Sequence, residues 1–203
     1  GLLGTSEVAL CYYHYDEILN AKELPLRYVA WSPCFRREAG AAGKDTKGLY
    51  RVHQFYKVEQ VVITKNDETV SAEEHAALLQ NSEELLQALE LPYQIVETST
   101  GDMGTKNVRM WDIETWMPSR ESYGETHSCS KLHDYQARRL KLRYRTEDKA
   151  KLFCHTLNNT ALASPRILIP LMEQYQNEDG TINVPKPLQP YMNGMEIIKP
   201  ANE

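Results

Sequence analysis

Three short segments carry residue types that suit phosphate and carboxylate chemistry. They are Phe35-Arg36-Arg37-Glu38, Arg51-Val52-His53-Gln54-Phe55 and the stretch from Asn158 to Arg166. A guanidinium group is a planar fork that binds phosphate or carboxylate oxygens in pairs, and the Phe55 ring offers a flat stacking surface. Taken one at a time, the arginines would be assigned to surface ion pairs, which contribute only ~0–1 kcal/mol. The sequence has no GxSxG, GxxxxGK[ST], GxGxxG or HExxH motif, which excludes the common hydrolase, nucleotide-binding and metalloprotease signatures.

Composition narrows the class of protein further. The chain has 203 residues, a net charge of -5 and a mean hydropathy of -0.55, which favours one globular domain and no membrane span. The acidic balance means that any nucleic-acid contact must be local. The six histidines are dispersed, and we expect packing or surface roles for them. The four cysteines are far apart and form no CxxC pair, so we expect neither a zinc site nor a disulfide scaffold, and we expect a reducing compartment.

A strand, a long basic loop and a second strand must position the first two segments. Residues 26–32 and 51–64 are rich in strand formers, and residues 36–51 between them hold three glycines and several cations. Alternation along the second strand predicts two faces. The face expected in the core holds Val52, Tyr56, Val58 and Val62. The other face is either solvated or the floor of a ligand site, and it holds Arg51, His53, Phe55, Lys57 and Glu59.

The remaining elements predict an α+β fold built on a mostly antiparallel sheet with flanking helices. Ser71 and Glu74 form a capping-box pattern at the start of a leucine-rich helix. We expect helices over 71–91 and 161–176, strands over 93–98, 108–117 and 138–145, and an extended, turn-rich tail.

In this order along the chain, the motifs resemble those of seryl-tRNA synthetase, a class II aminoacyl-tRNA synthetase. Residues 34–55 match the family's strand, long loop and second strand, and Thr5-Ser6-Glu7 matches its Thr-x-Glu motif. Residues 124–130 match its Glu-x-x-Ser-x-Ser stretch, and Leu157 to Arg166 match its last motif. The match covers nearly the whole chain.

The resemblance implies a class II catalytic fold that forms seryl-adenylate from L-serine and ATP and then transfers serine to tRNA(Ser). It implies that residues 1–203 are the part of the catalytic domain after the first class II motif. The family's N-terminal tRNA-binding helical arm has no counterpart in the chain. The resemblance also implies a homodimer for the full-length protein, with no membrane partner.

The resemblance assigns residues to the two ligands and to a metal. Arg36, Glu59 and Arg166 are the catalytic residues that it implies. ATP would be bound by Arg36, Arg37, Glu38, Arg51, Val52, Phe55, Glu125, Thr126, His127, Ser128 and Arg166. Serine would be bound by Thr5, Ser6, Glu7, Arg36, Glu59, Asn158 and Thr160.

Glu125 and Ser128 are the implied ligands of Mg²⁺ or Mn²⁺, whose hard character matches their oxygen atoms. Their spacing along a regular strand would place them on opposite faces, so the site requires a strand end or a β-bulge. The alternative for these two residues is a structural polar turn. The alternative or additional role for Asn158 and Thr160 is helix capping.

Two departures from the family pattern bear on the compartment. Gly124 stands where the family commonly has Arg, and His127 stands where a small residue is usual. Gly124 and the Tyr-Gly-Glu unit resemble mitochondrial members, which favours the mitochondrial matrix over the cytoplasm. Two other functions remain open at this point: a catalytically inactive paralogue that acts as a binding partner, and a ligase that loads an amino acid onto a carrier protein.

Overall fold

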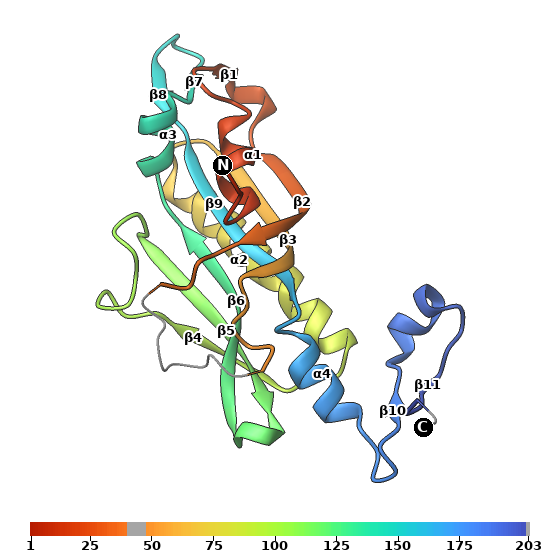
Figure 1. Ribbon diagram of the computed structural model, residues 1–203. Coiled ribbons are helices and arrows are strands. Elements are labelled where there is room, and N and C mark those ends of the chain that lie inside the picture. The colour runs from red at the N-terminus through yellow and green to blue at the C-terminus, as the bar shows by residue number, and fades with distance from the viewer. Residues whose placement is uncertain (40–47, 202–203) are drawn as a thin grey trace.

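A six-stranded antiparallel sheet forms the centre of the computed structural model, which describes residues 1–39 and 48–201 (Figure 1). The expected mostly antiparallel α+β fold is therefore confirmed. Gly40, Gly43, Lys44 and Lys47 of the basic loop lie outside the described residues. The strands follow one another in space as β2 (Leu26–Phe35), β3 (Gln54–Thr64), β9 (His155–Ser164), β6 (Ser122–Lys131), β5 (Arg109–Met117) and β4 (Tyr93–Glu97).

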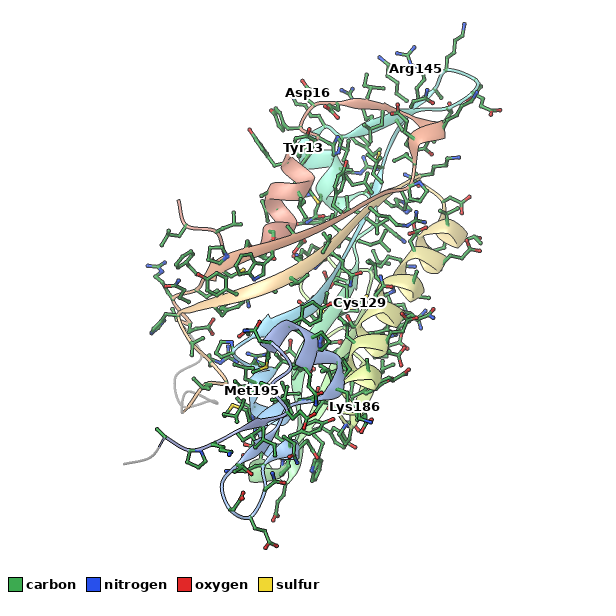
Figure 2. All side chains as sticks on the ribbon, turned by 90° about the vertical axis from the view of Figure 1, so that its right-hand side faces the viewer. Tyr13, Asp16, Cys129, Arg145, Lys186 and Met195 are labelled. Carbon is green, nitrogen blue, oxygen red and sulfur yellow. The ribbon has the colours of Figure 1, made fainter. Side chains whose placement is uncertain are left out.

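One face of this sheet is covered by α2 (Glu68–Ala88), which packs mainly on β9 and β6. Leu78 and Leu86 of the helix meet Val62, Ile113 and Leu157 of the sheet in the main core. Figure 2 shows side chains filling the layer between the sheet and α2, with Cys129 among them. Helix α4 (Leu168–Tyr175) packs near β5 at one end of this layer. The opposite face of the sheet carries α1 (Ser6–Tyr12) beside β2 and β3.

Two smaller sheets complete the chain. Strands β1 (Ile18–Asn20), β7 (Arg143–Arg145) and β8 (Lys151–Phe153) form one of them, over a second core that includes α3 (Tyr135–Leu140). Strands β10 (Ile182–Asn183) and β11 (Ile197–Ile198) form the other in the tail. Short 3₁₀ turns are η1 (Ala21–Glu23), η2 (Pro118–Arg120) and η3 (Lys186–Met192). Among the described residues, no helix is both long and apolar enough to cross a membrane.

The second strand differs from its predicted faces. It begins at Gln54, so Arg51, Val52 and His53 precede it. The alternation of side chains along the strand therefore does not determine on which face of the sheet these three residues lie. Tyr56 shares a face with the core residue Val62 but is 43% exposed and stacks on Trp31. The physical reason is that α2 lies mainly over β9 and β6 and leaves this end of the β2–β3 pair uncovered.

The start of the long helix was also predicted wrongly. The helix begins at Glu68, and its N-cap is Asp67, whose carboxylate accepts a hydrogen bond from the Val70 N–H at 3.0 Å. Ser71 is fully buried inside the first turns, where its hydroxyl lies 2.7 Å from His155 Nδ1. Ser71 therefore has a tertiary partner and caps nothing.

Two predicted elements contain a change of structure. Residues 138–145 are not one strand: α3 ends at Leu140, Lys141 adopts a left-handed conformation with φ 53°, and β7 starts at Arg143. Residues 161–176 are not one helix: β9 runs to Ser164, and α4 starts at Leu168. Strand β9 is central and buried along most of its length, so it lacks the two-residue alternation that identifies a half-buried strand.

We expect Asp67→Ala to lower the free energy of unfolding by about 1 kcal/mol, because the first turn of α2 loses its capping carboxylate. Urea unfolding followed by tryptophan fluorescence measures the effect. Glu73→Ala is the matched control, since Glu73 is an exposed carboxylate in the same helix. Equal effects of the two substitutions would contradict the assignment of the N-cap.

The stability should also fall as the pH is lowered from about 6.5 to 4. Burial, followed by the charge of neighbouring His133, lowers the pKa of His155 from 6.5 to about 4. The unfolded chain therefore takes up this proton first as the pH falls, so the stabilisation is complete above pH 6.5 and lost towards pH 4. Urea unfolding at several pH values should show a shallower decline in His155→Gln than in the wild type. His53→Gln, at an exposed histidine, should leave the decline unchanged.

Candidate functional site

A cavity opens beside β3, β6 and the end of β9, on the face of the sheet opposite α2. Its walls come from the residues after β2, from β3, from the bulged part of β6 and from the turn after β9. The predicted ATP-binding residues Arg36, Glu38, Arg51, Val52, Phe55, Glu125, Thr126, His127, Ser128 and Arg166 all line it. Arg37 does not: it is exposed and outside the lining.

Three arginines converge on this cavity, each oriented by specific neighbours. The Arg36 guanidinium lies 5.2 Å from the centre of the Phe55 ring and donates to the Gly4 carbonyl at 3.3 Å. Arg166 lies 4.3 Å from the centre of the Tyr50 ring and donates to the Tyr50 and Glu125 carbonyls, both at 3.0 Å.

The third arginine, Arg51, forms an ion pair between the two ends of the segment that joins β2 and β3. Arg51 Nη1 lies 2.6 Å from Glu38 Oε2, with both side chains mostly buried. Arg36, Arg51 and Arg166 thus place positive charge on several sides of one cavity that also contains an aromatic ring. Such an arrangement can hold a phosphate chain and a flat base together.

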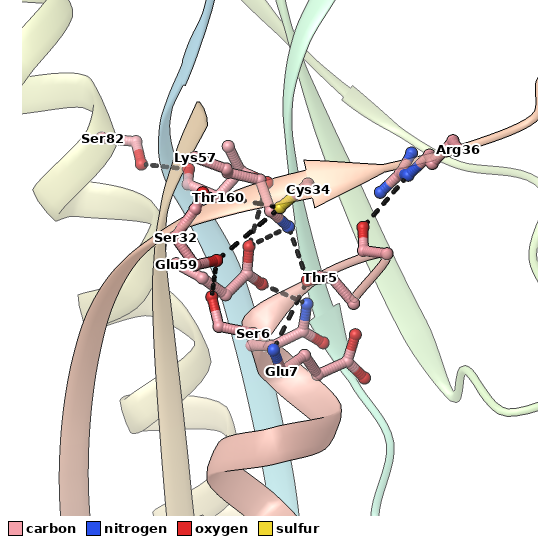
Figure 3. Close-up of polar contacts among 12 residues, drawn as sticks. Thr5, Ser6, Glu7, Ser32, Cys34, Arg36, Lys57, Glu59, Ser82 and Thr160 are labelled. Carbon is pink, nitrogen blue, oxygen red and sulfur yellow. Dashed lines mark hydrogen bonds and ion pairs between the residues drawn. The ribbon is translucent and has the colours of Figure 1, made fainter. Parts of the chain in front are cut away.

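Behind the cavity lining lies a fully buried carboxylate, here called the floor of the site, which is not itself part of the lining. Glu59 is 0% exposed. Its carboxylate accepts hydrogen bonds from Asn158 Nδ2 at 2.9 Å and from Thr160 Oγ1 at 3.5 Å. It also forms an ion pair with Lys57, two residues earlier on the same strand face. Figure 3 shows the carboxylate between β3 and the N-terminal turn of the chain. Asn158 and Thr160 lie in strand β9, so helix capping is not their role.

None of the three residues of the predicted Thr-x-Glu motif lines the cavity, and of the other predicted serine-binding residues only Arg36 and Thr160 do. Thr5 is the N-cap of α1, and its hydroxyl accepts a hydrogen bond from Lys57 Nζ at 2.8 Å. The Ser6 hydroxyl lies 3.1 Å from that of Ser32 on β2. Glu7 lies outside the cavity lining: its Oε1 is 2.8 Å from Lys106 Nζ and 2.6 Å from Gln136 Nε2. Thr5 is therefore linked to the floor of the site, whereas Glu7 anchors α1 to other elements.

A β-bulge brings Glu125 and Ser128 to the same cavity, as their spacing requires. Ile113 pairs with His127 and Glu114 pairs with Glu125, so Thr126 is the extra residue of β6. The Thr126 hydroxyl is 2.6 Å from that of Thr115 and 3.2 Å from the Ile113 carbonyl. The His127 ring is also buried, and burial lowers its pKa from 6.5 to about 4, so the ring is neutral at physiological pH. Of the two predicted possibilities, a strand end or a bulge, the structure has the bulge, and because β6 continues to Lys131 a simple polar turn is excluded.

Asp112 is a neighbour of this pair that the sequence did not single out. It pairs directly with Ser128 across β5 and β6, which places the two side chains on one face of the sheet. Burial raises the pKa of Asp112 from 3.8 to about 6, and the negative charge of Glu125 adds to the effect. Asp112 Oδ1 is buried and has no hydrogen-bond partner among the described residues.

The oxygen atoms of Glu125, Ser128 and Asp112 would suit a hard divalent cation. In the described part of the chain, no group of three or more His, Cys, Asp or Glu side chains could hold a metal ion. An ion here would therefore take further ligands from water and from phosphate groups, as Mg²⁺ commonly does.

Besides Asp112, the site contains Lys57 and Tyr50, to which sequence reasoning gave no ligand and no role. The sequence did place Lys57 on one strand face with Phe55 and Glu59, and it is the one cation of that set within the strand. No sequence pattern pointed to Tyr50 as a residue of the site. In the structure its ring packs against Gly124, where an added Cβ would lie 3.2 Å from it. A larger residue at position 124 would therefore need the Tyr50 ring, which supports Arg166, and the Met117 side chain to shift by a few tenths of an ångström.

Known proteins are similar to this chain in sequence and in fold. Residues 1–175 match the family model of the tRNA synthetase class II core domain (G, H, P, S and T). The chain is 54% identical over 197 residues to the serine–tRNA ligase of Deinococcus radiodurans, and the match covers 97% of this chain and 46% of that protein.

Two solved structures are similar over nearly the whole chain. Seryl-tRNA synthetase from Pyrococcus horikoshii, complexed with ATP, has a TM-score of 0.93 and 47% identity over 98% of this chain and 44% of that chain. Cytoplasmic serine–tRNA ligase from Naegleria fowleri, in complex with AMP, has a TM-score of 0.92 and 40% identity over 98% of this chain and 47% of that chain. The chain spans about half the length of these relatives. It therefore belongs to the tRNA synthetase class II core domain family, and the relatives that it resembles here are the serine–tRNA ligases.

Proposed function

We propose that the full-length protein activates L-serine with ATP, forming seryl-adenylate and pyrophosphate, and then transfers the seryl group to tRNA(Ser). The observation that carries the proposal is the buried carboxylate of Glu59, held by Asn158 and Thr160 beside an arginine-lined cavity. The high identity to serine–tRNA ligases supports the choice of serine. An inactive paralogue would be expected to lose some of these contacts.

ATP would bind in the cavity with its phosphate groups beside Arg36, Arg51 and Arg166. The Phe55 and Tyr50 rings, with the guanidinium groups stacked on them, provide flat surfaces for adenine. Arg36, at the boundary between the cavity and the Thr5 turn, would bridge the serine carboxylate and the α-phosphate, while Arg51 and Arg166 would hold the outer phosphates. Relatives whose structures contain ATP or AMP support nucleotide binding here.

The first step would be an in-line attack of the serine carboxylate on the α-phosphorus, with pyrophosphate as the leaving group. Negative charge grows on the phosphate oxygens in the transition state, so positioned guanidinium groups lower the barrier by electrostatic stabilisation. Arg36 is restrained by the Gly4 carbonyl and the Phe55 ring, which reduces the reorganisation needed during the reaction.

Serine recognition would depend on the polar side chains of Glu59 and Thr160 at the inner end of the cavity. Glu59 would accept hydrogen bonds from the α-ammonium or the hydroxyl of serine, and Thr160, which lines the cavity, adds a hydroxyl group. A site with buried hydrogen-bonding groups rejects ligands that lack the matching hydroxyl, because the site's own groups would then stay unpaired.

Glu125 and Ser128 would hold Mg²⁺ or Mn²⁺ beside the phosphates. The buried Oδ1 of Asp112, which has no hydrogen-bond partner in the part of the chain that the structure describes, is consistent with a cation nearby. When bound, the ion would supply charge neutralisation at the phosphate oxygens. The bulge at Thr126 gives the two ligands their common orientation.

We further propose that the full-length protein is a homodimer of the mitochondrial matrix or the cytoplasm, with a separate helical arm for tRNA. The outer strand β2 leaves Trp31 71% and Val29 68% exposed, and apolar surface on an edge strand is commonly covered by another chain. Gly124 supports the mitochondrial alternative by its resemblance to mitochondrial members of the family.

The full-length protein should catalyse serine-dependent ATP–pyrophosphate exchange. We expect alanine to be activated at least ~100-fold less efficiently than serine, since it leaves the hydroxyl's partners buried and unpaired. The measurement is kcat/KM for each amino acid in the exchange assay, followed by charging of tRNA(Ser). Comparable values for serine and alanine would refute the proposed pocket.

Glu125→Gln should raise the Mg²⁺ concentration needed for half-maximal exchange by ~10-fold or more, because an anionic ligand becomes neutral. Glu114→Gln is the matched control. Glu114 pairs across the strands with Glu125, but it binds Gln94 and lies outside the cavity lining. An unchanged Mg²⁺ requirement in Glu125→Gln would remove Glu125 from the metal site.

A further inference from the structure

Lys57 is a buried cation to which the proposed mechanism gives no role. It is 6% exposed and lies on β3 between Phe55 and Glu59. Its ammonium group forms an ion pair with the Glu59 carboxylate and donates to the Thr5 hydroxyl at 2.8 Å. Figure 3 shows Lys57 between these two partners. The hydrogen bond from Lys57 to Thr5 alone joins residues that are 52 positions apart in the sequence.

A buried ion pair is not in itself a source of stability. Removing two charges from water costs several kcal/mol per ion, and an apolar pair of similar volume is often as stable. Lys57 also lines the cavity, together with Thr160. A charged pair at the floor of a ligand site can instead set the geometry of the groups that contact the ligand.

On one side, the ammonium fixes the carboxylate. An ionised carboxylate accepts about four hydrogen bonds. Lys57, Asn158 and Thr160 approach Glu59 from β3 and from β9. These contacts determine the orientation of the carboxylate and leave capacity for a further donor from a ligand.

On the other side, the ammonium fixes the N-terminal turn. Thr5 is the N-cap of α1, and its hydroxyl also accepts a weak hydrogen bond from the Glu7 N–H at 3.4 Å. Ser6 contacts Ser32 on β2, and Arg36, the residue after β2, donates to Gly4, so this turn is attached on both sides of Thr5. Lys57 adds the link between the turn and the floor of the pocket.

We propose that Lys57 is a positioning residue for serine recognition. Its ammonium group holds the Glu59 carboxylate and the Thr5 hydroxyl in the relative placement that the amino acid requires. The inference rests on the proposed function, because it concerns the serine pocket of that site. ATP binding depends on other residues and does not require this link.

The test compares Lys57→Met with Lys131→Met in the full-length protein. Lys131 is a matched control: it is 4% exposed, forms an ion pair with Glu68 and lies outside the cavity lining. We expect Lys57→Met to raise the KM for serine by ~10-fold or more, while the KM for ATP changes by less than about threefold. Lys131→Met should change neither constant, although it also removes a buried charge.

The conservative variant Lys57→Arg, which keeps the charge, should recover part of the affinity for serine. If Lys57→Met does not fold, Lys57→Gln replaces it in the comparison of the serine and ATP KM values. Glutamine keeps a hydrogen-bond donor, which favours folding, but it lacks the positive charge. A serine KM that stays within threefold of wild type would overturn the proposal. Equal increases in both KM values would also overturn it, since they would indicate a general structural defect.

A second measurement does not need activity. Lys57→Met and Thr5→Val should each lower the urea midpoint of unfolding, and the double variant should lower it by less than the sum, because both substitutions remove the same contact. Additive effects would show that the ammonium and the hydroxyl are not coupled, which would overturn the link. If the wild type shows no serine-dependent exchange, the proposed function fails, and this cycle still decides whether Lys57 positions Thr5.

Discussion

The Glu59 carboxylate is a negative charge with no access to water, and the arrangement of the whole site follows from the need to satisfy it. An unpaired buried charge would cost far more than any single contact in the domain contributes. Its partners come from β3 itself and from the neighbouring central strand β9. The partner on β3, Lys57, in turn requires the Thr5 turn. One electrostatic requirement thus joins the N-terminal turn with strands β3 and β9.

The sheet achieves this convergence by departing from regular pairing at two points. In β6 the extra residue is Thr126, and in β9 it is Ala161, which has no partner between the pairs Val58–Leu162 and Glu59–Thr160. Each bulge lets residues with an odd spacing face one cavity: Glu125 with Ser128, and Thr160 with Ala163. Bulges bend a strand and re-aim side chains, so they are a common device beside binding sites.

The arginines of the cavity depend on the same scaffold in a different way. Arg36 and Arg166 are held by backbone carbonyls and aromatic rings, and Arg166 lies 3.7 Å from the Glu125 carboxylate. Contacts of this kind orient a guanidinium group without using all of its five donors. Cations so placed over a polar floor explain how a chain with a net charge of -5 can concentrate positive charge where phosphate groups would bind.

Local residue patterns determined the family, several strands of the sheet and most residues that line the cavity. The order of the motifs identified the family, and the runs of strand formers located β2, β3, β4 and β5. The spacing of Glu125 and Ser128 required either a strand end or a bulge. Tertiary packing decided the rest. Asp67 rather than Ser71 caps the start of α2, while the Ser71 hydroxyl instead contacts His155 of the distant strand β9. Asn158 and Thr160 lie in strand β9. The sequence did not identify this strand to its full length, because its burial removes the alternation of apolar and polar residues.

The roles of Lys57 and Asp112 could not be read from the sequence either, since each depends on partners that only folding brings close. The partner of Lys57 is the Thr5 turn, and that of Asp112 is the cross-strand residue Ser128. A sequence shows the type and spacing of its residues, whereas the electrostatic environment of a buried charge is set by groups from several elements at once.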